Sequence, residues 1–373
     1  MGLVTGTLPD FPWDTLAPFQ RIALSHPRGI VDLSVGTPVD PTPGVVRAAL
    51  AGASDAPGYP TTQGTAELRE AVVDWFARRR GVRGLDPTAV LPTVGSKELV
   101  AWLPSLLGLG PGDVVVHPVT AYPTYDVGAR LAGATALPAD DVAHWAGNVR
   151  LVWLNSPGNP DGTVRDVGEM RRIVDAARDV GAVVVGDECY AELAWERPWV
   201  SAGVPSVLDP RVTGGDLTGV LAIYSLSKQS NMAGYRAAFV TGDPAIVGRL
   251  LEVRKHAGMM VPAPVQAAMT AALADDAHVA VQREVYRRRR EILMAGVAAA
   301  GLVVDGSQAG LYLWVRPEEG GQDCWTTVAD LAGQGILVAP GSFYGEAGRG
   351  HVRMALTATD ERIREAAARL GGA

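Results

Sequence analysis

The 373-residue sequence has few cysteines and no long hydrophobic run. No apolar stretch reaches the roughly 18 residues that a membrane span needs. Residues 1–10 show no basic start followed by an apolar block, so we expect no secretory signal, no membrane and a cytoplasmic location. The two cysteines, Cys189 and Cys324, form no CxxC pair and indicate neither a disulfide framework nor a zinc site. None of the six histidines has HExxH spacing, which argues against metal chemistry.

The sequence is also poor in lysine and carries no excess of positive charge. Its formal net charge of −7 argues against a nucleic-acid surface, which would need a basic stripe. One basic run, Arg287 to Arg290, lies among Glu and apolar residues, and we interpret it as the solvated face of a long helix. Only three lysines occur, so chemistry that needs a primary amine has three candidates: Lys97, Lys228 and Lys255.

The middle of the chain alternates short β-branched runs with amphipathic stretches, a pattern typical of βαβ units and a mainly parallel sheet. The runs are almost wholly apolar, as expected when helices cover both faces of a sheet. The predicted strands are Asp113–His117, Val149–Leu154, Ala182–Gly186, Val220–Tyr224 and Ala237–Thr241. The predicted helices between them include Lys97–Leu107 and Val167–Val180.

The last hundred residues predict a smaller α+β lobe. A helical pattern runs from about Pro264 to Ala300, and an alternating segment, a helix, and a final strand and helix follow it. The full length of 373 residues suits two lobes around a cleft. We therefore divide the chain into a large domain of residues 40–270 and a small domain of residues 1–39 together with 271–373.

Polar residues gather where the predicted strands end. Because open parallel sheets bind ligands beyond the carboxyl ends of their strands, these residues are expected to meet at one cleft. A helix that begins at Gly95-Ser96-Lys97-Glu98 adds free backbone N–H groups, the usual seat of an anion. The four strand ends are followed by Ala121-Tyr122-Pro123-Thr124-Tyr125, Asn155-Ser156-Pro157-Gly158-Asn159-Pro160, Asp187-Glu188-Cys189-Tyr190 and Ser225-Leu226-Ser227-Lys228.

These motifs, in this order, resemble those of the fold-type I pyridoxal-5′-phosphate (PLP) enzymes, specifically the class I/II aminotransferases. The resemblance extends from Gly36 to Arg353. It implies the aspartate aminotransferase fold, with a large PLP-binding domain and a smaller α+β domain. Each motif alone would be a weak signal, whereas five in order at plausible spacing are a strong one.

The resemblance assigns the catalytic centre to three residues. Lys228 resembles the lysine that forms a Schiff base with PLP and then moves the substrate proton. Asp187 resembles the carboxylate that pairs with the pyridine nitrogen and keeps the ring protonated. Tyr190 resembles one donor to the phenolic oxygen of the ring, and Asn159 resembles the other.

The remaining assignments concern the cofactor phosphate, the substrate and a partner subunit. Tyr122 resembles the aromatic residue that stacks on the ring, and Arg353 the arginine that binds the substrate α-carboxylate. Tyr59 resembles the residue that enters the neighbouring subunit's cofactor site, which implies a homodimer. The expected phosphate contacts are Gly95, Ser96, Lys97, Ser225 and Arg236, and Gly36 is expected to give the substrate room.

Each residue also has a plainer interpretation. An aspartate after a strand is often only a helix cap, Asn159-Pro160 can be an ordinary turn, and Arg353 alone would more often form a surface ion pair. Tyr122 and Tyr125 can be core edges, and Cys189 a packed core thiol. These interpretations are independent, and all would have to hold together.

Within the family, two stretches are similar to the actinobacterial succinyldiaminopimelate aminotransferases: Pro92 to Asp113 and Tyr122 to Gly128. This similarity implies exchange of an amino group between glutamate and N-succinyl-2-amino-6-oxopimelate, in the biosynthesis of diaminopimelate and lysine. The long substrate carries a distant carboxylate, for which Lys97 is the candidate partner.

Three other functions are alternatives to a succinyldiaminopimelate aminotransferase, and some of them share its fold. A broad amino-acid or aspartate aminotransferase, or a PLP β-lyase, would use the same cofactor residues. A PLP-binding regulator would need a DNA-binding domain ahead of the aminotransferase core. A dinucleotide dehydrogenase is disfavoured because Gly108-Leu109-Gly110-Pro111-Gly112 is not GxGxxG and precedes a strand. A P-loop is also absent, because the glycines of that motif do not precede Lys228.

Overall fold

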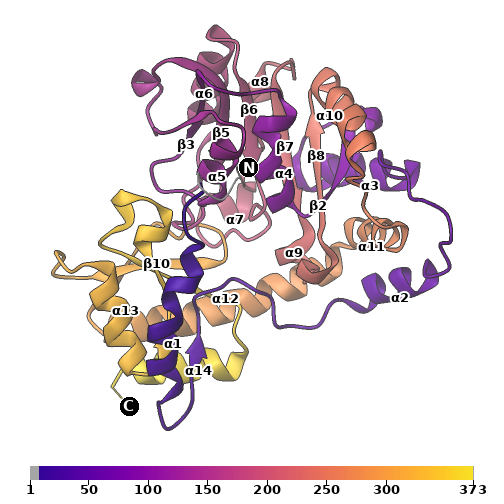
Figure 1. The fold of residues 1–373 in the computed structure, drawn as a ribbon. Coiled ribbons are helices and arrows are strands. Elements are labelled where there is room, and N and C mark those ends of the chain that lie inside the picture. Colours follow the sequence, from indigo (N-terminus) through magenta and orange to yellow (C-terminus); the bar gives the residue numbers. More distant parts are fainter. Residues whose placement is uncertain (1–7, 373) are drawn as a thin grey trace, which may run out of the picture.

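A seven-stranded sheet forms the centre of the larger part of the molecule (Figure 1). The computed structural model describes residues 8–372, so residues 1–7, on which the absence of a secretory signal partly rests, lie outside it. The strand order is β2-β8-β7-β6-β5-β3-β4, and every strand runs parallel to the others except β8. The strands are β2 (Val90–Val94), β3 (Asp113–His117), β4 (Thr135–Pro138), β5 (Asn148–Asn155), β6 (Val183–Asp187), β7 (Val220–Ser225) and β8 (Ala237–Gly242).

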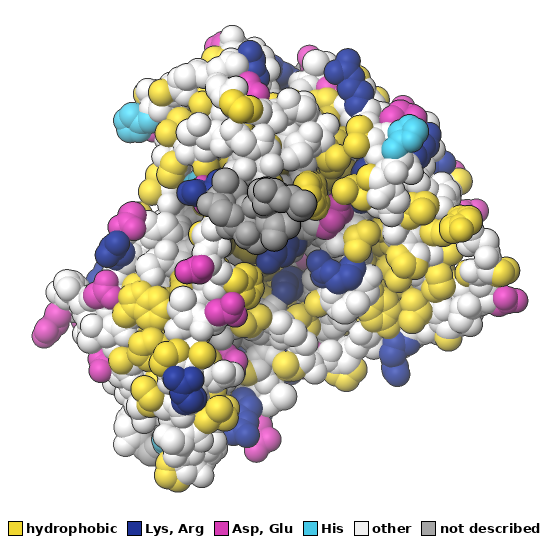
Figure 2. Space-filling model, viewed as in Figure 1, with side chains coloured by type: hydrophobic (Ala, Val, Ile, Leu, Met, Phe, Trp, Pro, Cys, Tyr) yellow, Lys and Arg dark blue, Asp and Glu magenta, His cyan; other side chains and the backbone are white. Residues whose placement is uncertain are grey.

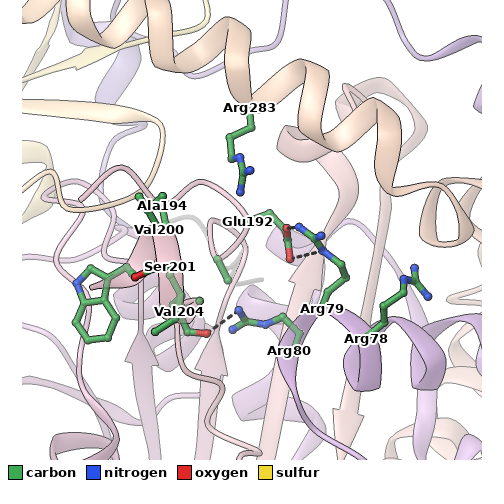
Figure 3. A pocket seen from close by; sticks show the side chains of 13 residues that line it. Arg78, Arg79, Arg80, Glu192, Ala194, Val200, Ser201, Val204 and Arg283 are labelled. Carbon is green, nitrogen blue, oxygen red and sulfur yellow. Dashed lines mark hydrogen bonds and ion pairs between the residues drawn. The ribbon is translucent and has the colours of Figure 1, made fainter. Parts of the chain in front are cut away.

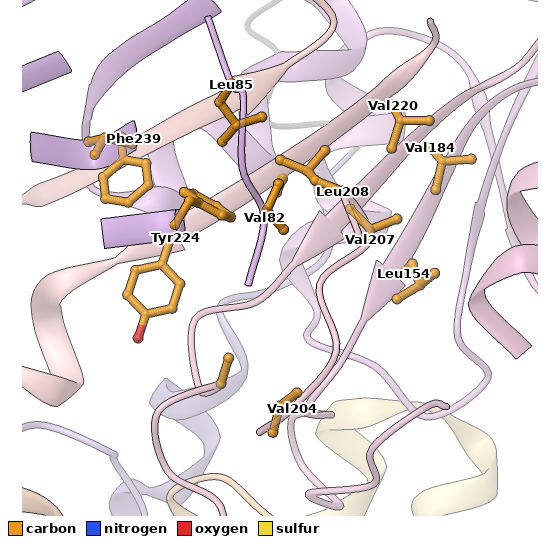
Figure 4. Close-up of a cluster of buried hydrophobic side chains, with 14 of the residues drawn as sticks. Val82, Leu85, Leu154, Val184, Val204, Val207, Leu208, Val220, Tyr224 and Phe239 are labelled. Carbon is orange, nitrogen blue, oxygen red and sulfur yellow. The ribbon is translucent and has the colours of Figure 1, made fainter. Parts of the chain in front are cut away.

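Both faces of this sheet are buried, because alternate residues of its strands belong to two separate cores. Val184 packs into one hydrophobic cluster, which Figure 4 shows in part, and Val185 packs into the other. The expected α/β fold with a mainly parallel sheet flanked by helices is confirmed. The surrounding helices are α2 (Gly44–Gly52), α3 (Ala66–Trp75), the π-helical turn η3 (Phe76–Arg80), α4 (Ser96–Leu106), α5 (Thr124–Leu131), α6 (Val167–Asp179), α7 (Trp199–Ala202), α8 (Pro210–Thr213), α9 (Leu226–Gln229), α10 (Pro244–Ala257) and α11 (Ala263–Ala274).

A second, antiparallel sheet of order β12-β13-β10-β9 forms the core of the smaller lobe. The N-terminal segment joins this lobe: Val31 of β1 pairs with Ile336 of β11, and α1 lies beside α13 in Figure 1. The elements are α1 (Ala17–Leu24), β1 (Val31–Asp32), α12 (Asp276–Ala299), β9 (Leu302–Asp305), β10 (Tyr312–Pro317), α13 (Cys324–Gly333), β11 (Ile336–Leu337), β12 (Ala339–Pro340), β13 (Val352–Ala355) and α14 (Asp360–Leu370). The domain limits at residues 39/40 and 270/271 stay a prediction.

The structure differs from the sequence-based expectations at two places. The single helical pattern from Pro264 to Ala300 is two helices, because Asp275 has an extended backbone and its carboxylate accepts the N–H of Ala277 to cap α12. The run Arg287 to Arg290 is only partly solvated. Arg289 is 3% exposed and forms ion pairs of 2.6 Å with both Asp40 and Asp360, so it ties the N-terminal segment and α14 to α12.

No helix within residues 8–372 is both long and apolar enough to cross a membrane. In the same part of the chain, no group of three or more His, Cys, Asp or Glu side chains has the arrangement of a metal site.

Candidate active site

The ends of three neighbouring parallel strands bring the predicted site residues to one edge of the large sheet. Asn155 of β5 lies directly opposite Asp187 of β6, and Asp187 lies opposite Ile223 of β7, two residues before Ser225. Asn155 donates hydrogen bonds of 3.1 Å to the carbonyl oxygens of Asp187 and Pro157, and it accepts the N–H of Asn159 at 2.8 Å. The turn after β5 is thereby fastened to β6, and Asn159 is held over the same edge.

Asp187 is a buried carboxylate surrounded by neutral donors. Its Oδ2 accepts a hydrogen bond of 2.8 Å from the Tyr125 hydroxyl, and its Oδ1 accepts the N–H of Cys189 at 3.3 Å. Burial raises the pKa of Asp187 above its ordinary value, because these donors compensate only part of the lost hydration. Within the described residues, no arginine or lysine forms an ion pair with it. A cationic ring nitrogen is the kind of group that would complete this environment.

Lys228 lies on α9, the short helix that Ser225 caps by accepting the N–H of Ser227. Its Nζ donates a short hydrogen bond to the carbonyl oxygen of Gly36, on the segment after β1. Burial lowers the pKa of Lys228, and Arg353 nearby acts in the same direction. A lysine with a lowered pKa is more readily the neutral amine, which is the form that condenses with an aldehyde.

Arg353 on β13 is 3% exposed and reaches the same edge from the small lobe. Its Nη1 donates to Asn159 Oδ1 at 3.0 Å, and its Nη2 donates to the carbonyl oxygen of Ser34 at 2.8 Å. Its Nε is buried and has no hydrogen-bond partner among residues 8–372. A guanidinium with neutral partners and a free Nε–H is suited to bind a carboxylate in its plane.

The candidate phosphate seat lies where α4 begins. Gly95 has a φ of +78°, and a Cβ at this position would lie 2.0 Å from Nη2 of Arg236, so glycine is required for the guanidinium to approach the start of the helix. At the junction of β7 and α9, the Ser225 and Ser227 hydroxyls lie 2.9 Å apart. Free N–H groups, a guanidinium and hydroxyls together suit a phosphate.

Lys97 and Tyr59 lie at the margin of the site, whereas Tyr122 packs against Tyr125, which contacts Asp187. Lys97 is exposed on the first turn of α4, with its Nζ 5.6 Å from the ring centroid of Phe11, and its pKa is lowered by burial and by Arg236. Burial raises the pKa of Tyr122 to about 12. Tyr59 is 97% exposed and touches nothing of this site in the single chain.

Figure 2 shows Lys and Arg side chains in the hollow between the two lobes. The sequence places Asn155 and Tyr125 among the polar residues that follow the strands but gives them no role in the site, and it does not indicate Tyr312. Tyr125 is more than a core edge, because its hydroxyl reaches Asp187. Asn155 could have been found as the first residue of the turn motif that ends with Asn159. No local signal marks Tyr312, which depends on the pairing of distant strands.

A cavity of about 300 Å³ lies behind the segment that follows Asp187 (Figure 3). Arg79 and Arg80 from η3, and Arg283 from α12, line it together with Glu192. Arg79 pairs with Glu192, and Arg80 pairs with Glu188 and with the carbonyl oxygen of Val204. Because Lys228 and Arg353 do not line it, this cavity is separate from the candidate active site.

The fold and this set of residues define a class: a fold-type I enzyme whose lysine, carboxylate and anion seat suit PLP. The residues at this edge of the sheet fit PLP. Lys228 supplies a primary amine, Asp187 supplies a buried carboxylate without a cationic partner in the described residues, and the absence of a side chain at Gly95 lets Arg236 approach the start of α4. The family model of aminotransferase class I and II matches residues 28–370. The chain belongs to this family, and it is a PLP-dependent aminotransferase.

Two relatives and one solved structure match nearly the whole chain. The chain is 58% identical over 364 residues to the 4-dedimethylamino-4-oxo-anhydrotetracycline transaminase OxyQ of Streptomyces rimosus, covering 97% of this chain and 99% of that protein. It is 58% identical over 370 residues to a probable aminotransferase of Mycobacterium tuberculosis, covering 99% and 87%. The solved structure of a probable N-succinyldiaminopimelate aminotransferase from Thermus thermophilus superposes with a TM-score of 0.85 at 30% identity, covering 97% and 100%.

Proposed function

We propose that the chain transfers an amino group from an α-amino acid such as glutamate to an oxo acceptor in two half-reactions, with Lys228 as the cofactor-bearing lysine. The observation that carries the proposal is the set of incompletely paired charges at one edge of the sheet. Asp187 and Arg353 are buried and Lys228 is partly buried, and each has only neutral partners within the described residues.

Each charge has a distinct task in the proposed reaction. Bound PLP supplies an electron sink that makes the Cα proton of the substrate removable. Lys228 would take this proton from Cα and hold it, for which its lowered pKa suits it. Asp187 would keep a proton on the ring nitrogen, and Arg353 would fix the substrate through its α-carboxylate. Asn159 and Tyr190 would hold the ring through its phenolic oxygen.

For the acceptor, we propose N-succinyl-2-amino-6-oxopimelate as the first candidate. The argument is Lys97, which is exposed on α4 beside Arg236 and forms no ion pair within the described residues. A cation at the margin of the site suits a substrate with a carboxylate far from the reacting carbon. The similarity in fold to the Thermus thermophilus protein supports this candidate.

A bulky cyclic ketone is the second candidate, and the 58% identity to the tetracycline-pathway transaminase of Streptomyces rimosus favours it. Such a substrate needs no distant cation, so Lys97 would not contribute to its binding. The two candidates therefore differ in what a substitution at Lys97 does.

We also propose a homodimer in which Tyr59 enters the partner's cofactor site. Tyr59 is 97% exposed, and Val39 and Val45 nearby in the chain are 49% and 41% exposed. Figure 2 shows hydrophobic side chains gathered on the side where Figure 1 places α2 and α11. An exposed tyrosine beside such a surface is typical of an interface. Sedimentation of the wild type and of Tyr59→Ala, with cofactor titration of both, tests this proposal.

The experiment that tests the function is the visible absorption spectrum of the purified protein with PLP, before and after addition of glutamate. We expect a band that glutamate bleaches, and loss of that response in Lys228→Ala. Lys255→Ala is the matched control, because Lys255 is exposed and pairs only with Glu252. A wild-type spectrum without such a band after addition of PLP would sink the proposal.

The substitution Lys97→Ala tests the acceptor. If the succinylated substrate is correct, KM for it should rise about tenfold, as expected for the loss of a charge-assisted contact, whereas KM for glutamate should change less than about twofold. Equal changes in both KM values would place Lys97 on the cofactor phosphate instead. An unchanged KM for the succinylated substrate would remove the role in its recognition and favour the cyclic ketone.

A further inference from the structure

Tyr312, at the start of β10, is a buried residue whose ring and hydroxyl contact different parts of the candidate site. Its strand is hydrogen-bonded to β13, where Trp314 lies opposite Arg353. The Tyr312 ring centroid lies 3.8 Å from Cζ of Arg353, and its hydroxyl lies 3.2 Å from the hydroxyl of Tyr190. The two contacts join the residue assigned to the substrate with a residue assigned to the cofactor.

The ring covers one face of the Arg353 guanidinium. Nη1 and Nη2 each donate one of their two N–H groups, to Asn159 and to Ser34, so within the described residues three of the five N–H donors, including Nε–H, are left for a ligand. A ligand carboxylate must therefore approach close to the guanidinium plane. Stacking on the ring keeps that plane in place, and a desolvated cation on an aromatic face is a favourable arrangement.

The hydroxyl occupies a position that a glycine leaves open. A Cβ at Gly36 would lie 2.2 Å from Oη of Tyr312, so the hydroxyl fits only because residue 36 has no side chain. Gly36 is also the residue whose carbonyl oxygen accepts the hydrogen bond from Lys228. Although burial raises the pKa of Tyr312, Arg353, Lys228 and the Tyr190 hydroxyl together bring it below its ordinary value. Each hydroxyl has one proton, and the role proposed for Tyr190 uses its own toward the cofactor, which leaves Tyr312 as the donor in the 3.2 Å contact.

We propose that Tyr312 is a positioning residue with two separable roles: its ring orients Arg353 for the substrate carboxylate, and its hydroxyl orients Tyr190 toward the cofactor. The proposal rests on the functions proposed above for Arg353 and Tyr190. By donating to the Tyr190 oxygen, Tyr312 strengthens the hydrogen bond that Tyr190 donates onward. It also directs the Tyr190 O–H away from the small lobe.

Two substitutions separate the roles. Tyr312→Phe keeps the ring and removes the hydroxyl, whereas Tyr312→Leu removes both. Tyr344→Phe is the matched control, because the Tyr344 ring also lies near Arg353, 4.9 Å from its Cζ, but its buried hydroxyl has no hydrogen-bond partner in the described part of the chain. The readouts are the dissociation constant of glutarate, a dicarboxylate that cannot react, and the pH midpoint of the visible band of the PLP-loaded protein.

For Tyr312→Phe we expect unchanged glutarate affinity within about twofold and a higher pH midpoint, because a weaker hydrogen bond from Tyr190 stabilises the unprotonated form less. For Tyr312→Leu we expect the same rise and a loss of about tenfold in glutarate affinity. Tyr344→Phe should change neither. An unchanged midpoint in Tyr312→Phe overturns the role of the hydroxyl, and unchanged glutarate affinity in Tyr312→Leu overturns the role of the ring.

A crystal structure of the cofactor-free Tyr312→Leu protein gives a readout that needs no chemistry. We expect Arg353 to leave its position against Asn159 and Ser34. If Arg353 stays in place, the ring does not position it, even in a folded variant. If the wild type shows no glutamate-sensitive band while this displacement is seen, the proposed function has failed and the positioning role has not.

Discussion

Asp187 and Glu188 are adjacent buried acids whose side chains have opposite surroundings. Glu188 forms an ion pair of 2.8 Å with Arg80 and accepts hydrogen bonds from the Ser206 hydroxyl at 2.8 Å and the Val207 N–H at 2.7 Å. Within the described residues, the donors to Asp187 are all neutral: the Tyr125 hydroxyl, the Cys189 N–H and the Cys189 thiol. A residue that only stabilises the fold is satisfied by the fold itself, whereas a residue that serves a ligand is left with an unmatched charge.

The same contrast distinguishes a buried cation that stabilises the fold from the cations of the candidate site. Arg254, which is fully buried, forms a bidentate ion pair with Glu98 at 2.8 and 3.1 Å. Lys228 and Arg353 donate only to neutral oxygens. Because buried charges are normally paired, the missing partners indicate where a charged ligand belongs.

The largest effect is expected on the structural side of this comparison. Arg80→Leu should destabilise the protein by about 3–5 kcal/mol, since it leaves the Glu188 carboxylate buried without its cation. Arg211→Leu is the control, because the Arg211 side chain is 70% exposed in its pair with Asp209, and it should cost about 1 kcal/mol or less. Chemical denaturation of both cofactor-free proteins measures the difference. Equal losses of unfolding free energy in the two variants would show that the buried Arg80–Glu188 pair is no more important to stability than an exposed pair.

On the site side, Asp187→Asn should affect the cofactor more than the fold. We expect PLP affinity to fall at least about tenfold, because the amide offers no charge to a protonated ring nitrogen. The free energy of unfolding of the cofactor-free protein should change by about 1 kcal/mol or less, since the substitution removes a buried charge and keeps an acceptor oxygen. Titration with PLP and denaturation measure the two quantities, with the exposed Asp216→Asn as control. A loss of stability as large as that of Arg80→Leu contradicts this expectation.

The smallest effect is a pH dependence. Because the pKa of Lys228 is lowered in the folded protein, the folded chain binds fewer protons than the unfolded chain, and its stability rises with pH across the window up to the ordinary lysine value near 10.5. Lys228→Met removes this contribution. The cofactor-free variant should therefore exceed the wild type in Tm at about pH 7, and the gap should narrow toward about pH 9.5. A gap that is constant with pH, or equal to that of Lys255→Met, would show that Lys228 is not the cause.

The sequence predicted most of the large sheet because its strands are continuous apolar runs, and β3 agrees with its expected limits at both ends. It did not reveal that β8 runs antiparallel or that β2 lies at the sheet edge, since both depend on pairing between residues that are far apart in the chain, such as Val90 and Thr241. The prediction that Arg287 to Arg290 form a solvated face of α12 was wrong for Arg289 for the same reason. Arg289 is buried because Asp40 and Asp360 reach it from distant parts of the chain.

For the site, motif spacing identified the residues that follow the strands, and their gathering at one edge agrees with the structure. It missed contacts made across lobes. Tyr312 acts on Arg353 through the pairing of β10 with β13, which no local pattern encodes. Gly36 was expected only to leave room for the substrate, but its missing side chain also leaves room for the Tyr312 hydroxyl.

The pairing of Val31 with Ile336 has a consequence for synthesis of the protein. The segment that brings the Gly36 carbonyl to Lys228 is synthesised about 300 residues before the strand that anchors it and before Arg353. A nascent chain can form its large sheet while the amine of Lys228 still lacks its neighbours from the small lobe. Capture of the cofactor in a complete pocket must therefore wait until the chain has been synthesised at least as far as Arg353.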